Sequence, residues 1–389
     1  MTPNLLARDK QYYKLDITDN LPPGTDSILQ FELEPRQPRP PPPPKRPVPE
    51  WPPEAERKGK WISKYLDKLD PETEYDQIVK TAIFFMANSF AFSAGYASTF
   101  IHLVQTPAGA AAVHQTAKAY RRGHQRFFET QDYFLDWMWY GSGSEISIKR
   151  LESVNKIHAS VWKQVPGAYS HPWEGEMAII GAAYFETYLR KLTGARRKEP
   201  HPNVQRAWPE WGERVCALLR TEPADGSRSF GVNFPRTWEE LEGFYLWFQR
   251  IPMETYTNEE DSRKAHDASE AFLRQFSMLW FPRRFQWLGR QVVLTVIPAQ
   301  VREHNRIGHP NPLAETLVKF AIKIYLDVKD ALPDPVRPVF SDEYHAAKGV
   351  NWNKTDIKAE AEWTRRDQIT NAVMVAMVLV FGLGLFLRI

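Results

Sequence analysis

The sequence predicts an all-α fold built as one large helical domain, and two patterns support the prediction. From about residue 60 to about residue 330, apolar side chains recur mostly at i, i+3 and i+4, the spacing of a buried helix face. The alternation of β-branched residues that is typical of strands is scarce in the same region. We therefore expect helices at about 62–70, 76–105, 107–139, 145–164, 174–193, 205–220, 238–249, 260–279, 284–303 and 312–330.

Signals for helix starts support these boundaries. Ser142-Gly-Ser-Glu145 has the spacing of a capping box and follows Gly141, and Thr237-Trp-Glu-Glu240 repeats that spacing after Pro235. In a capping box, a hydroxyl and a carboxylate satisfy amides that the first helical turn leaves free. We therefore expect one helix to begin at each of these places. The segments 196–203 and 222–233 have the composition of loops.

A long stretch without charge, Thr81–Ala117, is either a membrane span or part of the core. It contains polar side chains, among them Asn88, Ser93 and His102, which a lipid-facing helix would have to satisfy internally. We therefore expect a helix that is buried in the domain core.

The composition excludes several classes of protein. Fifty Lys and Arg against 47 Asp and Glu leave a net charge of +3, too small an excess for a protein built to bind phosphate backbones, so nucleic acid is not an expected partner. The single cysteine, Cys216, excludes an internal disulfide framework and cysteine-rich metal sites. We interpret Cys216 as a small core residue rather than a thiolate ligand. Any metal must be held by histidine or carboxylate, or arrive in a prefabricated cofactor.

The composition also divides the chain into segments. We expect an extended, Pro-rich N-terminal segment at 1–60, the helical domain at 61–335, a juxtamembrane linker at 336–368 and a transmembrane tail anchor at 369–387. Eleven of the 31 prolines lie between Pro35 and Pro53, which predicts polyproline II conformation. This stretch is either a spacer or a docking ligand for a partner of the SH3 or WW type.

The segment 369–387 contains no charged residue and would extend about 28 Å as a helix, close to the hydrocarbon thickness of a bilayer. We expect a single-pass membrane protein anchored by this tail, with a buried terminal helix as the alternative. The positive-inside rule places the main body in the cytosol. The residues behind that assignment are Lys354, Lys358, Arg365 and Arg366 before the segment and Arg388 after it.

Candidate site residues lie on two consecutive predicted helices. Arg122, Arg126 and Thr130 recur at i, i+4 and i+8 and so share one face of the first helix. In the second helix, His158 and Trp162 lie on the apolar face. Taken alone, His158 is more typical of a core histidine than of a ligand, and Arg126 of a solvated or salt-bridged arginine.

Their order along the chain resembles a known family. The segments Arg126-Phe-Phe-Glu-Thr130 and Val154-Asn-Lys-Ile-His158-Ala-Ser-Val161-Trp162 are similar to the catalytic domain of latex-clearing rubber oxygenases. The two segments are still more similar to the catalytic domain of the fungal membrane-bound branch of this family. That branch consists of the ER-bound oxygenases of the MpaB type, which cleave a farnesyl side chain. The likeness covers about residues 75 to 330. Further matching segments are Thr106-Pro-Ala-Gly109, Glu176 to Leu189 and Phe230 to Glu240.

The resemblance implies an all-α domain around a haem b pocket. It places His158 as the ligand of the haem iron, Arg126 and Thr130 as the catalytic residues that handle oxygen, and Trp162, with Arg126, beside the cofactor. It also implies a small hydrophobic substrate, prenylated or terpenoid, whose C=C bond is cleaved with O2, and a location in the endoplasmic reticulum. A neutral imidazole is an ordinary iron ligand, and a permanent guanidinium charge can stabilise an oxygen anion. Two alternatives stay open: a haem peroxidase or hydroxylase, and a non-catalytic membrane scaffold.

Helix geometry adds a constraint. Thr130 lies 11 residues before Gly141 and His158 lies 14 residues after Ser144, so the two sit at similar depths in an antiparallel hairpin. Close-packed helices are about 8–10 Å apart, too near to hold a macrocycle between them. The two helices must splay or cross, or other helices must intervene.

Several other residues have more than one interpretation. Glu129 stands where the rubber-cleaving branch has a lysine, and it is either a surface or a salt-bridging carboxylate. Three histidines on neighbouring predicted helices either contact haem propionates or pack in the core. Three arginines contact propionates or lipid headgroups, or they form a solvated face. These residues are His102, His114 and His124, and Arg283, Arg284 and Arg290.

Overall fold

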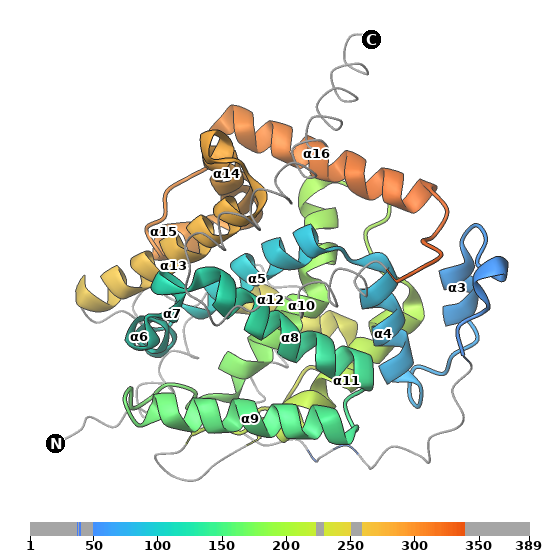
Figure 1. Ribbon diagram of the computed structural model, residues 1–389, viewed down its shortest axis with the longest axis horizontal. Coiled ribbons are helices and arrows are strands. Elements are labelled where there is room, and N and C mark those ends of the chain that lie inside the picture. The colour runs from blue at the N-terminus through green and yellow to red at the C-terminus, as the bar shows by residue number, and fades with distance from the viewer. Residues whose placement is uncertain (1–36, 38, 40–49, 223–228, 250–258, 339–389) are drawn as a thin grey trace.

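Helices make up the regular structure of the part of the chain that the computed structural model describes, apart from an isolated antiparallel bridge between Arg220 and Ser229. The described residues are 37, 39, 50–222, 229–249 and 259–338 (Figure 1). The prediction of an all-α class is confirmed for them. The predicted membrane helix 369–387 and most of the predicted N-terminal segment lie outside the described residues.

The helices follow one another along the chain. In chain order they are η2 (Glu54–Glu56), α3 (Trp61–Leu66), α4 (Tyr75–Met86), α5 (Ser89–Leu103), α6 (Pro107–Thr116), α7 (Lys118–Arg121), α8 (Gly123–Tyr140), α9 (Glu145–Trp162), α10 (Pro172–Thr193), α11 (Pro202–Leu218), α12 (Trp238–Phe248), α13 (Glu259–Trp280), η4 (Arg283–Phe285), α14 (Gln286–Val296), α15 (Ala299–His304) and α16 (Pro312–Ala331).

Three predicted helices are divided in the structure. The helix expected at 76–105 bends by 112° between α4 and α5, where the Asn88 side chain accepts a hydrogen bond from the amide of Ala91 and starts a new helix. The helix expected at 107–139 is three helices, because Ala117 adopts a left-handed φ of 51° and Arg122 leaves helical geometry. The helix expected at 284–303 is interrupted before Pro298, whose ring and missing amide disfavour a continuous helix.

One of the two predicted capping boxes is displaced. The N-cap of α9 is Ser144, which accepts a hydrogen bond from the amide of Ser147, and not Ser142. Ser142 is instead part of the turn before the helix. Thr237 caps α12 as predicted, by accepting a hydrogen bond from the amide of Glu240.

The uncharged stretch around α4 and α5 belongs to the core, as predicted. Ile78, Phe84, Ala97 and Ile101 have no exposed surface. Among the described residues, no single helix is long and apolar enough to cross a membrane. Helices α4 and α5 together have the length and the apolar composition of a membrane span, but the chain bends sharply between them. The burial of this pair is what a core helix requires.

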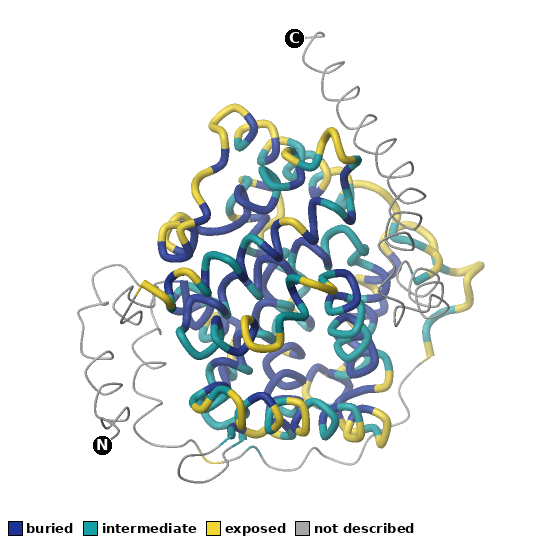
Figure 2. The backbone as a smooth tube through the Cα atoms, turned by 60° about the vertical axis from the view of Figure 1, so that its left-hand side comes forward, coloured by how far each residue is buried: buried dark blue, intermediate teal, exposed yellow. Residues whose placement is uncertain are grey.

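Two apolar clusters meet at α10, near the middle of the molecule (Figure 1). Buried segments fill the interior of the molecule, and exposed ones lie mostly at its periphery (Figure 2). Ile180 and Tyr184 of α10 belong to the cluster with α3, α4, α11 and α12. Phe185 and Leu189 belong to the cluster with α5, α13 and α14. Helix α10 also packs closely against α5, where a Cβ at Gly181 would lie 2.4 Å from Oγ1 of Thr99. The core is therefore continuous across α10.

A buried ion-pair network joins α10 to α16. Arg190 is 1% exposed and donates to Asp330 at 2.6 Å and to Glu186 at 2.8 Å. Burial alone would raise the pKa of Glu186, but Lys329 and Arg190 outweigh it and lower the pKa to about 2. Removing Arg190 would leave Glu186 with Lys329 and Asp330 with Arg197, but both carboxylates would lose their buried cation.

We expect Arg190→Ala to lower the free energy of unfolding by roughly 3 kcal/mol, the low end for a broken buried pair because its partners are partly exposed. Chemical denaturation gives the measurement. Arg206→Ala is the matched control, because Arg206 is 59% exposed and pairs with an exposed Glu72. Equal midpoints for the two variants would contradict a stabilising role for the network.

Candidate functional site

The site is built on the hairpin of α8 and α9, which pack against each other. The turn between them depends on Asp76 of α4, whose carboxylate accepts a hydrogen bond from the amide of Ser142 at 2.7 Å. Gly141 has a φ of 85°, and a Cβ there would lie 2.9 Å from the Asp76 carboxylate. Glycine is therefore required on steric grounds at this turn. Arg150 of α9 adds a hydrogen bond of 2.7 Å to Asp136 of α8.

Three of the four predicted site residues line one cavity, which we call the His158 cavity. Arg126 and Thr130 reach it from α8 and His158 from α9, and its empty volume is about 1420 Å³, including space open to solvent. Trp162, the fourth, is partly buried but is not among the residues that line this cavity. The structure therefore brings these three side chains together, and the roles assigned to them stay predictions.

Other helices supply the remaining walls, which resolves the spacing problem of the hairpin. Helices α5, α6 and α10 contribute to the same cavity as α8 and α9. Several wall residues are small, and they leave room that larger side chains would fill. These small residues are Ala108, Gly109 and Ala112 of α6 and Gly175 and Ala178 of α10.

His158 is held as a neutral, unpaired imidazole. Its Nδ1 is sealed from solvent and has no hydrogen-bond partner among the described residues. Burial lowers the pKa of His158 to about 4, so the ring carries no charge at neutral pH. Ring nitrogens of His102 and His124 are also buried without a partner, so what distinguishes His158 is that its side chain lines a cavity where a ligand can be bound.

Tyr169 is a neighbour of His158 that sequence reasoning missed. Its ring stacks on the imidazole with centroids 3.8 Å apart and an interplanar angle of 10°. The residue has a φ of 58°, uncommon outside glycine, and its carbonyl accepts a hydrogen bond of 2.9 Å from the amide of Glu222. Burial raises the pKa of Tyr169 to about 12. The sequence signals only a turn near Gly167, and the stacking arises from the tertiary fold.

Arg126 lies over aromatic rings at the boundary of the cavity. Its guanidinium carbon is 4.2 Å from the ring centre of Phe100 and 5.1 Å from that of Phe272. One nitrogen donates to the hydroxyl of Tyr96 at 2.5 Å. The hydroxyl of Thr130 donates to the carbonyl of Arg126 at 2.9 Å, so Thr130 must turn before it can donate to a ligand.

Glu129 forms a salt bridge, one of the two alternatives that the sequence left open. It pairs with Lys118 and accepts a hydrogen bond of 2.8 Å from Gln125. Glu129 and Lys118 both line the His158 cavity and both are partly exposed. The pair therefore places opposite charges together at the wall.

The other histidines and Cys216 lie outside the residues that line the His158 cavity. His102 places Nδ1 2.7 Å from the carbonyl oxygen of Ser98, and burial lowers its pKa to about 4. Burial lowers the pKa of His124 to about 4 as well, and His114 lies near the hydroxyl of Tyr120. Cys216 is fully buried, which raises the pKa of its thiol. Packing is therefore the interpretation that the structure supports for all four.

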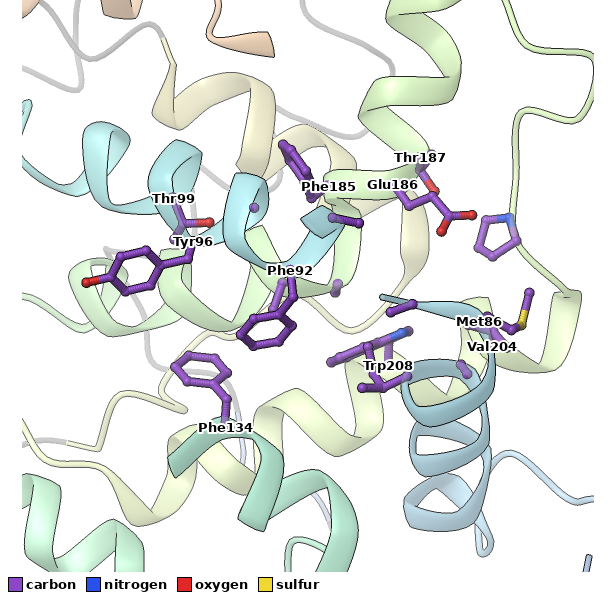
Figure 3. A pocket seen from close by; sticks show the side chains of 18 of the residues that line it. Met86, Phe92, Tyr96, Thr99, Phe134, Phe185, Glu186, Thr187, Val204 and Trp208 are labelled. Atoms are coloured by element: carbon purple, nitrogen blue, oxygen red, sulfur yellow. The ribbon is translucent and has the colours of Figure 1, made fainter. Parts of the chain in front are cut away.

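Two further cavities continue from the His158 cavity. The aromatic cavity, of about 1130 Å³, shares Phe100, Thr130, Phe134 and Ala178 with it. Phe92 of α5 and Phe134 of α8 point toward one another across this space (Figure 3).

The outer cavity shares Met86, Ala87 and His201 with the aromatic cavity and is also lined by α16. The three cavities therefore form a series that leads from His158 toward α16. Shared wall residues place each cavity beside the next one.

A family model matches most of the helical domain. The model described as the ER-bound oxygenase mpaB/B′ and rubber oxygenase catalytic domain matches residues 84–324. The chain belongs to this family. The protein therefore carries an oxygenase catalytic domain and is an oxidoreductase. The matched range contains Arg126, Thr130, His158 and Tyr169. A search of curated proteins found no match.

Replacing Tyr169 by Ala should expose His158. We expect diethyl pyrocarbonate to modify His158 roughly fivefold faster in Tyr169→Ala, because an aromatic stack contributes about 1 kcal/mol. Tyr169→Phe keeps the stack and should modify at the original rate. Peptide mass spectrometry measures the rates, with His114 as an internal reference in each digest. An equal increase in both variants would show that the ring does not shield the imidazole.

Proposed function

We propose that this protein is a haem b-dependent oxygenase that uses O2 to cleave a C=C bond of a prenylated or terpenoid substrate. The observation that supports this most directly is the shared cavity. His158, Arg126 and Thr130, whose sequence segments resemble the family motifs, all line it. An aromatic cavity of matching polarity for a prenyl chain adjoins it.

The residues of the His158 cavity fit a haem. The unpartnered Nδ1 of His158, on a side chain that lines the cavity, supports a role in binding a ligand, and burial keeps the imidazole in the neutral form that binds a metal. The walls are mostly apolar, with small residues on α6 and α10 where a flat group needs space. Among the described residues, no group of three or more His, Cys, Asp and Glu is placed to hold a bare metal ion. A single imidazole suits a metal whose other ligands come from a macrocycle.

A bound haem would supply the redox chemistry of dioxygen, and the protein would control its surroundings. His158 would donate its ring nitrogen, while Tyr169 restricts rotation of the imidazole through the stack. Arg126 is permanently charged, and its contacts with Phe100 and Tyr96 hold the guanidinium at the wall. Its charge would stabilise negative charge that develops on oxygen. Thr130 lines both cavities and would donate a hydrogen bond to an oxygen atom after turning from the Arg126 carbonyl.

The substrate chain would occupy the aromatic cavity. Phe92, Phe134 and Trp208 line it and exclude water from an apolar chain (Figure 3). Because Thr130 and Phe134 belong to both cavities, a chain that extends through the boundary passes beside the residues assigned to oxygen handling. The position of the boundary would therefore decide which double bond reacts.

Membrane attachment is the second part of the proposal. The uncharged segment 369–387 would anchor the chain as a single span in the endoplasmic reticulum, with the catalytic domain in the cytosol. A prenyl chain partitions into lipid, so anchoring raises its concentration near the domain. The Pro-rich stretch 35–53 remains a candidate spacer or docking segment, and Arg39 within it pairs with Glu210 and Glu213 of α11.

Turnover of a prenylated aromatic under ¹⁸O2 by the purified full-length chain tests the function. We expect a Soret band, oxygen uptake and shortened carbonyl products that carry the label, which mass spectrometry detects. His158→Ala should lose the Soret band and the uptake, whereas His102→Ala should keep the band, because His102 does not line the cavity. Turnover that depends on added peroxide instead of O2 would contradict the proposal and favour the peroxidase alternative.

We expect turnover to require both the charge of Arg126 and the planar shape of its guanidinium. Arg126→Lys keeps a cation but loses the planar group that lies on Phe100 and reaches Tyr96. We expect kcat to fall by about 10²-fold, the usual cost of one preorganised donor, with the Soret band retained. Arg122→Lys is the matched control, because Arg122 is exposed one turn earlier. Equal activities of the two variants, measured by oxygen uptake, would remove Arg126 from the reaction.

A further inference from the structure

The outward side of α16 carries an unusual row of exposed apolar side chains. Leu313 is 70% exposed, Leu317 52%, Phe320 46% and Val328 47%. Their spacing of three, four and eight residues places them along one side of the helix. We call these four residues, with Leu332 just beyond the helix, the α16 strip.

The inner side of the same helix is apolar as well. Ala314, Val318 and Leu326 are buried where α16 packs against α10 and α14. A surface helix of a globular protein normally has one apolar stripe and a polar opposite face. Helix α16 has apolar residues on its inner and its outer side, so the outer side has the composition of a surface that binds a partner or a membrane.

The neighbouring elements η4 and α14 carry exposed aromatic side chains as well. Phe285 of η4 is 54% exposed and Trp287 at the start of α14 is 58% exposed. Helix α14 packs against α16, which runs along one edge of the molecule (Figure 1). Arg283 and Arg284 are exposed beside these two rings and have no ion-pair partner among the described residues. Aromatic rings next to free cations are typical of the interface between lipid headgroups and acyl chains.

The position of the strip in the chain also points to lipid. The described residues end at 338, shortly after α16 ends at Ala331. The uncharged segment 369–387 follows in the sequence. A linker of 37 residues, 332–368, separates the end of α16 from that segment, so an anchored chain would tether α16 to the bilayer. The outer cavity is lined by Val328 and Leu332 of the strip, so the series of cavities begins at this surface.

We propose that the α16 strip, with Phe285 and Trp287, lies in the interfacial layer of a bilayer and turns the mouth of the outer cavity toward the lipid. Apolar molecules would then reach the aromatic cavity from the membrane without crossing water. The proposal relies on the anchor in the proposed function for its orientation, but not on haem or on turnover. Arg283 and Arg284 would meet anionic headgroups.

Lipid-borne quenching tests this directly. Cys216 is fully buried, so a single cysteine introduced at the surface can be labelled in the full-length chain. We would place an environment-sensitive fluorophore at Leu317→Cys, with Lys149→Cys on α9 as the control, because the Lys149 side chain is 75% exposed. The proteins are reconstituted in phosphatidylcholine and phosphatidylserine vesicles that contain a nitroxide-labelled lipid.

We expect strong quenching at residue 317 and little at residue 149. Equal quenching at the two positions would overturn the proposal. A probe at residue 317 that is shielded from water but not quenched by the nitroxide would also overturn it, because a protein segment, 369–387 or a second copy, would then cover the strip. Neither result depends on turnover, so failure here is distinct from failure of the oxygenase assignment.

A second pair of variants separates a lipid contact from simple proximity. Phe320→Glu combined with Val328→Glu should lower quenching at residue 317 by several-fold, because charges are costly in the acyl region. Ile146→Glu combined with Ile148→Glu is the matched control, because both residues are exposed on α9, to 44% and 45%. Unchanged quenching in the first double variant would overturn the role of the strip.

Discussion

The turn at Gly141 is the constraint on which the rest of the site depends. The Asp76 carboxylate accepts the amide of Ser142 and leaves no room for a Cβ at Gly141. This contact fixes where α8 ends and α9 begins, and so which residues of the two helices face the same space. A shift by one residue would rotate each site side chain by about 100° about its helix. The joint placement of Arg126, Thr130 and His158 therefore rests on one turn that a third helix holds.

Burial gives the site its chemical character. An exposed imidazole would be partly protonated near neutral pH, whereas burial lowers the pKa of His158 to about 4 and keeps it neutral. The same enclosure makes the charge of Arg126 effective, because aromatic rings rather than water surround much of the guanidinium. A neutral nitrogen and a fixed cation thus face one cavity, a combination suited to a metal cofactor that handles an anionic oxygen ligand.

The series of cavities links this site to the edge of the molecule. Shared wall residues place the His158 cavity beside the aromatic cavity, and the aromatic cavity beside the outer one. The outer cavity opens beside α16, whose apolar outer side adjoins the end of the described chain. This arrangement is the basis of the proposal that an apolar substrate enters from the membrane and passes aromatic walls before it reaches the polar residues.

The sequence by itself determined the helical class, and its motif order grouped Arg126, Thr130 and His158. Helix periodicity and family spacing are local properties, so the chain shows them without coordinates. The breaks at Asn88 and Ala117 were not predicted, because an uncharged run of residues does not reveal where a helix must bend to pack. Only the tertiary structure placed Tyr169 on His158 and excluded His102 from the cavity walls. Those contacts join residues on separate elements, and packing rather than local sequence decides which of them meet.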